Sequence, residues 1–84
     1  MTRSRRKAMH EKQREEQART VYEFIRTFIE EEGHSPSFTE IAEGCFISKG
    51  SALRYVDWLE AWGYIRREPN TPRTISLVDP ERRL

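Results

Sequence analysis

The apolar residues of this 84-residue chain follow a helical period over most of the sequence and alternate with polar residues near its end. Between residues 11 and 32 they recur at intervals of three and four, which is typical of a helix that buries one face. This pattern predicts a long first helix that stops at Gly33, a residue suited to left-handed backbone. Residues 1–10 are basic and show no period, so we expect a mobile arm there. The predicted inward stripe is Ala18, Val21, Tyr22, Ile25, Phe28 and Ile29.

Two shorter helices are predicted in the middle of the chain, each opened by a serine. Ser37 stands three residues before Glu40, which is the S-x-x-E spacing of a capping box. Ser48 predicts the N-cap of a helix that runs to Trp62, with Gly63 as its stop. The predicted inward residues are Ile41, Ala42 and Cys45 in the first of these helices, and Ala52, Tyr55, Val56, Leu59 and Trp62 in the second.

The last third of the chain predicts a β-hairpin. Residues 64–67 and 73–78 alternate in polarity, and the loop between them contains two prolines and an asparagine. Residues 79–84 form a polar tail. The fold class predicted is therefore mainly α with a small β-hairpin, a three-helix winged helix-turn-helix preceded by a basic N-terminal extension. We place the domain at residues 11–78, between an arm at 1–10 and the tail.

Composition argues against several classes of protein. No apolar run approaches the roughly 20 residues that span a bilayer, and the basic N-terminus lacks the apolar stretch of a secretory signal. Cys45 is the single cysteine, which excludes an internal disulfide, and it is expected to fill a core pocket. With His10 and His34 it forms no metal-ligand spacing. Because paired carboxylates, a nucleophile with its base and a phosphate loop are also lacking, we expect no enzyme, cofactor, metal or small-molecule ligand.

Charge is segregated along the sequence although the net charge is only +1. Residues 1–19 hold seven Lys or Arg and three Glu, a net charge of +4. Residues 20–47 hold one Arg and six Glu, a net charge of −5, and residues 48–84 hold seven basic and five acidic residues, a net charge of +2. Such segregation is typical of a protein that offers one basic face to a polyanion.

The helix that starts at residue 49 has the properties of a DNA-recognition helix. Its first turn is small, polar and basic, and helix N-termini attract phosphate oxygens. Arg54 could donate two hydrogen bonds to a guanine in the major groove. Leu53 could contact a thymine methyl group, or could be an ordinary solvent-exposed leucine. The residues of the predicted first turn are Ser48, Lys49, Gly50 and Ser51.

Arginines flank the predicted hairpin loop. Arg66, Arg67 and Arg73 would follow phosphates or enter the minor groove, or would be edge-strand charges that prevent sheet pairing, and both roles are compatible. The arm at residues 1–10 either follows the DNA backbone or serves as a solubilising terminus.

Several of these segments together resemble the DNA-binding domain of LexA-type repressors. They are E-I-A at 40–42, I-S at 47–48, A-L-R-Y-V-D-W-L-E at 52–60 and G-Y-I at 63–65. H-S-P-S at 34–37 and P-R-T-I-S-L at 72–77 narrow the resemblance, which covers roughly residues 20–78. It implies sequence-specific binding with the third helix in the major groove, as a homodimer on a two-fold symmetric operator. The candidate DNA-binding residues are Ser37, Thr39, Ser48, Lys49, Gly50, Ser51, Leu53, Arg54, Arg66, Arg67, Thr71 and Arg73.

The chain also departs from that family. Phe46 stands where the family has the glycine of the helix–helix turn, and we expect Gly44 to adopt the strained backbone instead. The L-T-x-R-Q opening is replaced by E-E-Q-A at 15–18. LexA repressors continue into a self-cleaving peptidase after the position where this sequence ends. We therefore expect no self-cleavage, in either a free-standing regulator or an excised domain.

The leading hypothesis is a cytoplasmic, nucleoid-associated transcriptional regulator of bacterial, phage or mobile-element origin that represses by covering promoter DNA. The alternatives are a winged-helix protein-interaction module and an accessory DNA-binding factor in replication or partition. Self-association would involve Trp58, the early first helix or the edge of the hairpin. We expect Trp62 to be buried and Trp58 to lie nearer the surface, where it covers the hairpin or forms a self-association patch.

Overall fold

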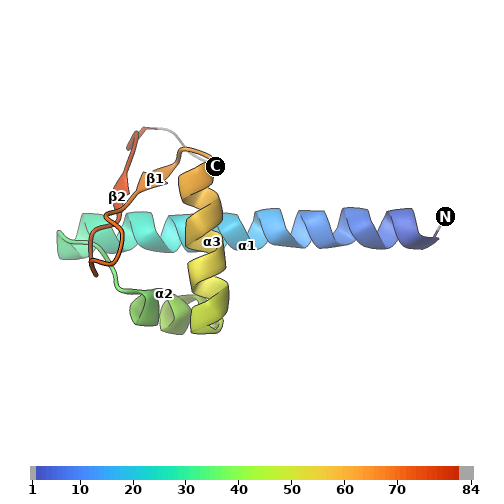
Figure 1. Cartoon of the computed structure of the whole chain (residues 1–84), viewed down its shortest axis with the longest axis horizontal. Coiled ribbons are helices and arrows are strands. Elements are labelled where there is room, and N and C mark those ends of the chain that lie inside the picture. Colours follow the sequence, from blue (N-terminus) through green and yellow to red (C-terminus); the bar gives the residue numbers. More distant parts are fainter. Residues whose placement is uncertain (1, 82–84) are drawn as a thin grey trace.

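The structure, a computed structural model, describes residues 2–81, with side chains from residue 13 onward (Figure 1). Its elements follow the predicted order of three helices and a hairpin. They are α1 (Thr2–Glu32), α2 (Phe38–Cys45), α3 (Lys49–Ala61), β1 (Ile65–Arg66) and β2 (Ser76–Leu77). The two strands form one antiparallel pair, in which Ile65 lies opposite Leu77 and Arg66 opposite Ser76. The predicted mainly α fold with a small β-hairpin is confirmed.

The long helix α1 forms one side of the molecule. In Figure 1, α3 and the hairpin cross in front of α1, α2 lies below it, and the N-terminal half of α1 extends past all of them. The predicted start near residue 11 is wrong, because α1 already begins at Thr2. Residues 2–32 contain neither glycine nor proline and are rich in strong helix formers, so no local signal stops the helix before Gly33. The division into an arm, a domain and a tail stays a prediction. No helix within residues 2–81 is long and apolar enough to cross a membrane.

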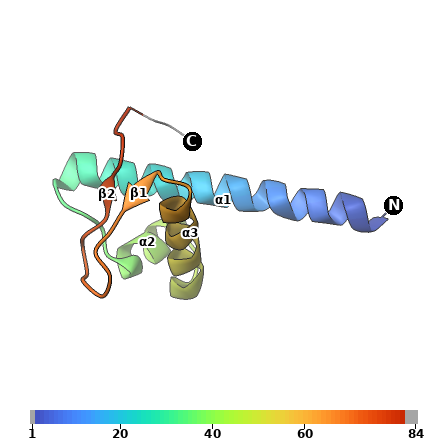
Figure 2. The ribbon, with the colours of Figure 1, turned by 45° about the horizontal axis from the view of Figure 1, so that its top comes forward.

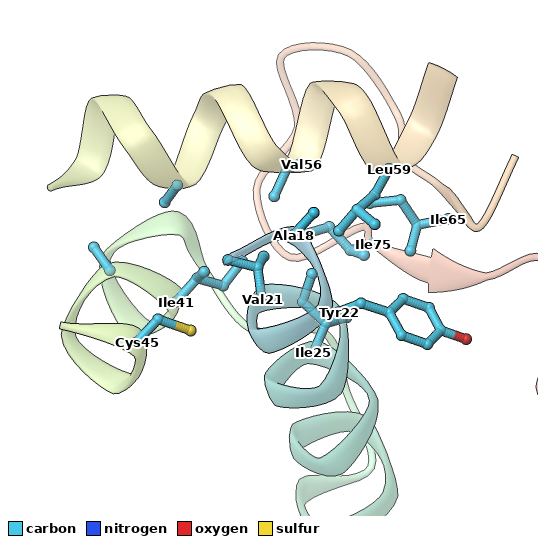
Figure 3. Packing of buried hydrophobic residues seen from close by; sticks show 12 residues of the cluster. Ala18, Val21, Tyr22, Ile25, Ile41, Cys45, Val56, Leu59, Ile65 and Ile75 are labelled. Atoms are coloured by element: carbon cyan, nitrogen blue, oxygen red, sulfur yellow. The ribbon is translucent and has the colours of Figure 1, made fainter. Parts of the chain in front are cut away.

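The core lies where α1, α2, α3 and the hairpin meet (Figure 3). Most of the predicted inward residues are buried, whereas Phe28, Ile29 and Tyr55 are only half-buried. The cysteine also lies in the core, and burial raises the pKa of the Cys45 thiol. The buried apolar residues are Ala18, Val21, Tyr22, Ile25, Ile41, Ala42, Cys45, Ala52, Val56, Leu59, Ile65 and Ile75.

The prediction for Trp62 is wrong, because its side chain is 45% exposed. Trp62 follows the last residue of α3 and stacks on Trp58, with ring centroids 6.1 Å apart. Among the side chains of residues 13–81, α1 places Arg14 and Glu15 rather than apolar residues beside the indole, so the core of these residues does not extend beneath it. Trp58 is half-buried and is therefore the better covered of the two.

The predicted serine caps of α2 and α3 and the glycine stop of α3 are confirmed. Ser37 Oγ accepts a hydrogen bond from the Glu40 N–H at 3.1 Å, and the Glu40 carboxylate accepts one from the Ser37 N–H at 2.8 Å. The predicted capping box is therefore present. Ser48 Oγ likewise accepts from the Ser51 N–H at 3.1 Å at the start of α3. Gly63 ends that helix with a left-handed φ of 83°.

The turn between α2 and α3 differs from the prediction. Phe46 itself adopts the left-handed conformation, with φ 57° and ψ 44°, and Gly44 does not. The N–H groups of Phe46 and Ile47 donate to carbonyls of α2 at 3.4 and 3.0 Å, which is the Schellman pattern of helix ends. Gly44 serves packing instead, because a Cβ there would lie 2.1 Å from Cε2 of Phe24.

Replacing Phe46 with glycine should stabilise the fold. An L-residue in the left-handed conformation is strained by about 1–2 kcal/mol, and glycine is not. Glycine loses more conformational entropy on folding, which reduces the gain in stability by up to about 1 kcal/mol. The ring is 95% exposed, so its removal gives up little packing. We expect Phe46→Gly to raise the free energy of unfolding in urea by up to about 1 kcal/mol. Phe46→Ala keeps the strained backbone and serves as the control, with no comparable gain.

Candidate nucleic-acid interface

The first turn of α3 lies on the side of the domain away from α1 (Figure 2). Ser48 caps the helix, Lys49 and Gly50 are exposed, and Ser51 is half-buried. This turn contains no acidic residue that would neutralise the partial positive charge of its N–H groups. It therefore presents small side chains, one lysine and a positive helix end to the solvent.

The outward face of α3 continues with Leu53 and Arg54, which are both exposed. Three exposed cations lack a carboxylate partner among the side chains of residues 13–81, namely Lys49 and Arg54 of α3 and Arg66 of β1. Their charges are therefore available to an external anion.

A second cluster lines a groove of about 320 Å³ between α3, the start of α2 and the hairpin loop. It brings together five predicted site residues that are far apart in sequence, while Thr39 and Arg66 are exposed outside it. Leu53 faces this groove, so it is not an isolated apolar side chain in solvent. The five are Ser37, Leu53, Arg67, Thr71 and Arg73.

Two of the three hairpin arginines are held by the protein itself. Arg67 pairs with Asp57 and with Glu60, the latter at 3.3 Å, and its guanidinium lies 5.5 Å from the centre of the Phe38 ring. Its side chain is only 22% exposed. Arg67 thus joins the end of β1 to both α3 and α2, and it is less suited to a phosphate contact than Arg66.

Arg73 connects the hairpin to the capping box of α2. Its guanidinium lies 2.7 Å from the Glu40 carboxylate and donates to the Ser35 carbonyl at 3.4 Å. The buried Ser35 hydroxyl accepts from the Ile75 N–H at 3.0 Å, which adds a second connection. The H-S-P-S and P-R-T-I-S-L segments are therefore in direct contact.

The same contacts set the charge state of the capping carboxylate. The hydrogen bond from the Ser37 backbone N–H is the main reason that the pKa of Glu40 lies below its usual range. Partial burial raises this pKa, and the Ser37 hydroxyl and Arg73 lower it further. No group of three His, Cys, Asp or Glu side chains among the described residues could hold a metal ion.

The sequence model of the LexA DNA binding domain matches residues 9–74, which include every predicted site residue. The chain belongs to the LexA DNA-binding domain family. It is 37% identical over 62 residues to the LexA repressor of Staphylococcus carnosus, a match that covers 73% of this chain and 30% of that protein. The LexA repressor of Frankia alni is 38% identical over 65 residues, with 76% of this chain and 26% of the relative covered. That of Caldicellulosiruptor saccharolyticus is 39% identical over 62 residues, with 73% and 31% covered.

The chain spans less than a third of the length of these LexA repressors. The segments that carry the family resemblance lie at the contact of α2 with the hairpin, along α3 and at the start of β1. Phe46 was not predicted as a surface residue, although its ring is exposed in the turn before α3. An aromatic residue at a glycine position of the family was the signal that could have identified it.

Glu40→Gln should lower stability in a pH-dependent way. Because the folded-state pKa is lowered, the carboxylate contributes stability above its ordinary value of 4.5 and loses that contribution as the pH falls through the folded-state pKa. We expect Glu40→Gln to melt below the wild type at pH 7, and the difference to shrink on acidification below 4.5. Thermal melting of both proteins, at pH values from 7 to below 4.5, measures this difference in melting temperature.

Glu43→Gln is the matched control for that experiment. Glu43 is exposed on the same helix and pairs with no cation among the side chains of residues 13–81. A loss of melting temperature in Glu40→Gln that is the same at every pH, or that Glu43→Gln reproduces, would contradict the assignment.

Proposed function

We propose that this chain is a sequence-specific double-stranded DNA-binding domain of a transcriptional repressor. The first turn of α3 carries the proposal, because no carboxylate among the side chains of residues 13–81 pairs with Lys49 or the nearby Arg54, and the turn itself contains no acidic residue. Membership of the LexA DNA-binding domain family supports the same function. An α-helix fits the major groove of B-DNA, which is about 12 Å wide.

Each part of the interface has a distinct task in this proposal. Arg54 reads base edges, because its planar fork matches the two acceptors of guanine. Lys49 and Arg66 bind phosphates and fix the register of the domain on the duplex. The loop with Thr71 contacts the backbone or minor groove beside the site that α3 reads. The domain represses by occupying promoter DNA that polymerase requires.

Arg54→Ala tests the base contact. Loss of a bidentate arginine–guanine contact should weaken binding by about 1–3 kcal/mol and relax the sequence preference at one base pair. Fluorescence anisotropy with a duplex enriched from a random pool by the wild-type protein measures both effects. Lys49→Ala should instead weaken binding to all sequences and reduce the salt slope by about 1.

Arg19→Ala provides the control, because Arg19 is an exposed arginine on α1. It should leave affinity nearly unchanged. If the wild-type protein fails to bind any duplex even at low salt, where non-specific affinity is strongest, the DNA function itself is refuted.

We further propose that two copies bind a two-fold symmetric operator and associate through the tryptophans at the end of α3. Trp62 is 45% exposed and stacks on Trp58, while Arg14 lies 5.7 Å from the centre of the Trp58 ring. These residues and Glu15 line a hollow of about 230 Å³. The patch lies at the opposite end of α3 from its first turn, so a partner there would not compete with DNA. Exposed tryptophans of this kind are frequent anchors of protein interfaces.

Trp62→Ala should weaken self-association. Truncation of an interface tryptophan typically costs about 2 kcal/mol or more, which corresponds to a dissociation constant raised at least tenfold. Sedimentation equilibrium over a concentration series measures the change. Leu53→Ala, at a side chain of similar exposure on the DNA-facing side, should leave association unchanged. A wild-type protein that stays monomeric at every concentration would refute the dimer.

A further inference from the structure

Phe46 is the most exposed large apolar side chain of residues 13–81. Its ring is 95% exposed, against 43–45% for Leu53, Trp62 and Val78. Its backbone is also left-handed, a conformation that bulky L-residues rarely adopt. Neither packing nor local backbone preference accounts for a phenylalanine here, and strained residues of this kind cluster at functional sites.

The position of Phe46 connects it to the proposed DNA interface. The residue lies in the turn from α2 to α3, two positions before the Ser48 cap. In Figures 1 and 2 this turn lies at the same end of the domain as the first turn of α3, away from α1. The Schellman hydrogen bonds of the turn fix the backbone there, so the direction of the Cα–Cβ bond is fixed before any ligand binds.

The surroundings of the ring favour DNA over a protein partner. The neighbouring residues Glu43, Gly44, Ser48 and Lys49 are all exposed, and all but the glycine are polar. Protein-binding sites are usually marked by a contiguous apolar patch, which this single ring does not provide. The major groove combines phosphates at its rim with the apolar methyl groups of thymine, and a phenylalanine can contact such a methyl. Lys49 and Phe46 match these two features.

We propose that Phe46 is a specificity-determining residue that packs against the C5-methyl group of a thymine at the edge of the major groove, next to the bases read by α3. This inference rests on the proposed DNA-binding function. It adds a thymine preference at a flanking operator position, and it makes the turn part of the interface rather than only a connection between helices.

The test removes the methyl group and the ring separately. Deoxyuridine replaces thymine at one position at a time in the selected duplex, which deletes only the methyl group. The wild-type protein should lose about fourfold in affinity at one position, as expected for one buried methyl group. Phe46→Ala should bind the thymine duplex about tenfold more weakly and should show no further loss at that position.

The controls separate the possible failures. Leu53→Ala should keep the sensitivity at the position assigned to Phe46, since its side chain faces the groove beside the hairpin. Phe46→Ala removes a ring that is 95% exposed, so a melting temperature near the wild-type value verifies its fold. The inference is overturned if Phe46→Ala binds as tightly as the wild type, or if it keeps the same uracil sensitivity.

Two further experimental outcomes would have different meanings for the role of Phe46 and for the proposed function. Weaker self-association of Phe46→Ala in sedimentation, with unchanged DNA affinity, assigns the ring to a protein contact and also overturns the inference. Failure of the wild-type protein to bind any duplex refutes the proposed function before Phe46 is tested.

Discussion

The proposed interface depends on the polar contacts that join the recognition motif to the hairpin, and the carboxylate of Glu40 provides one of them. It accepts the Ser37 N–H at 2.8 Å at the start of α2, and it pairs with Arg73 at 2.7 Å. Ser35 supports the same junction from inside through the Ile75 amide. A winged domain must hold its recognition helix and its loop at a fixed separation in order to contact one duplex. Here segments nearly 40 residues apart meet that requirement through a few polar contacts.

Ion pairs within the protein leave less unpaired positive charge on its surface than the sequence suggests. Arg73 and Arg67 each neutralise carboxylates of the protein, and Arg67 also covers the Phe38 ring. Arg67 and Arg73 thus mainly hold the hairpin against α2 and α3. Specific binding then depends on the few unpaired cations near α3 and on the shape of the surface, because each phosphate contact adds to affinity without reading sequence.

The sequence predicted the features that depend on local spacing, namely the capping box of α2, the serine cap of α3, the glycine stops and most of the buried stripes. It did not predict the start of α1, where helix propensity is uninterrupted back to Thr2. Nor did it predict the exposure of Trp62, which depends on the polar residues that α1 places beside it. The pairing of Arg73 with Glu40 was also missed, since the two residues are 33 positions apart and no periodicity connects them.

The turn between α2 and α3 shows why the fold tolerates a phenylalanine in place of glycine. Two constraints act on it independently: hydrogen bonds from the Phe46 and Ile47 amides back to α2, and the close approach of Phe24 to Gly44. The first fixes the left-handed residue, and the second holds α2 against α1. Together they determine the backbone whatever side chain stands at position 46, so strain there raises the energy of the turn without changing its path. The packing of α2 against α1 therefore depends on the glycine at 44, whereas the crossing of α2 and α3, and with it the presentation of the recognition helix, depends on the hydrogen bonds of the turn rather than on a glycine at 46.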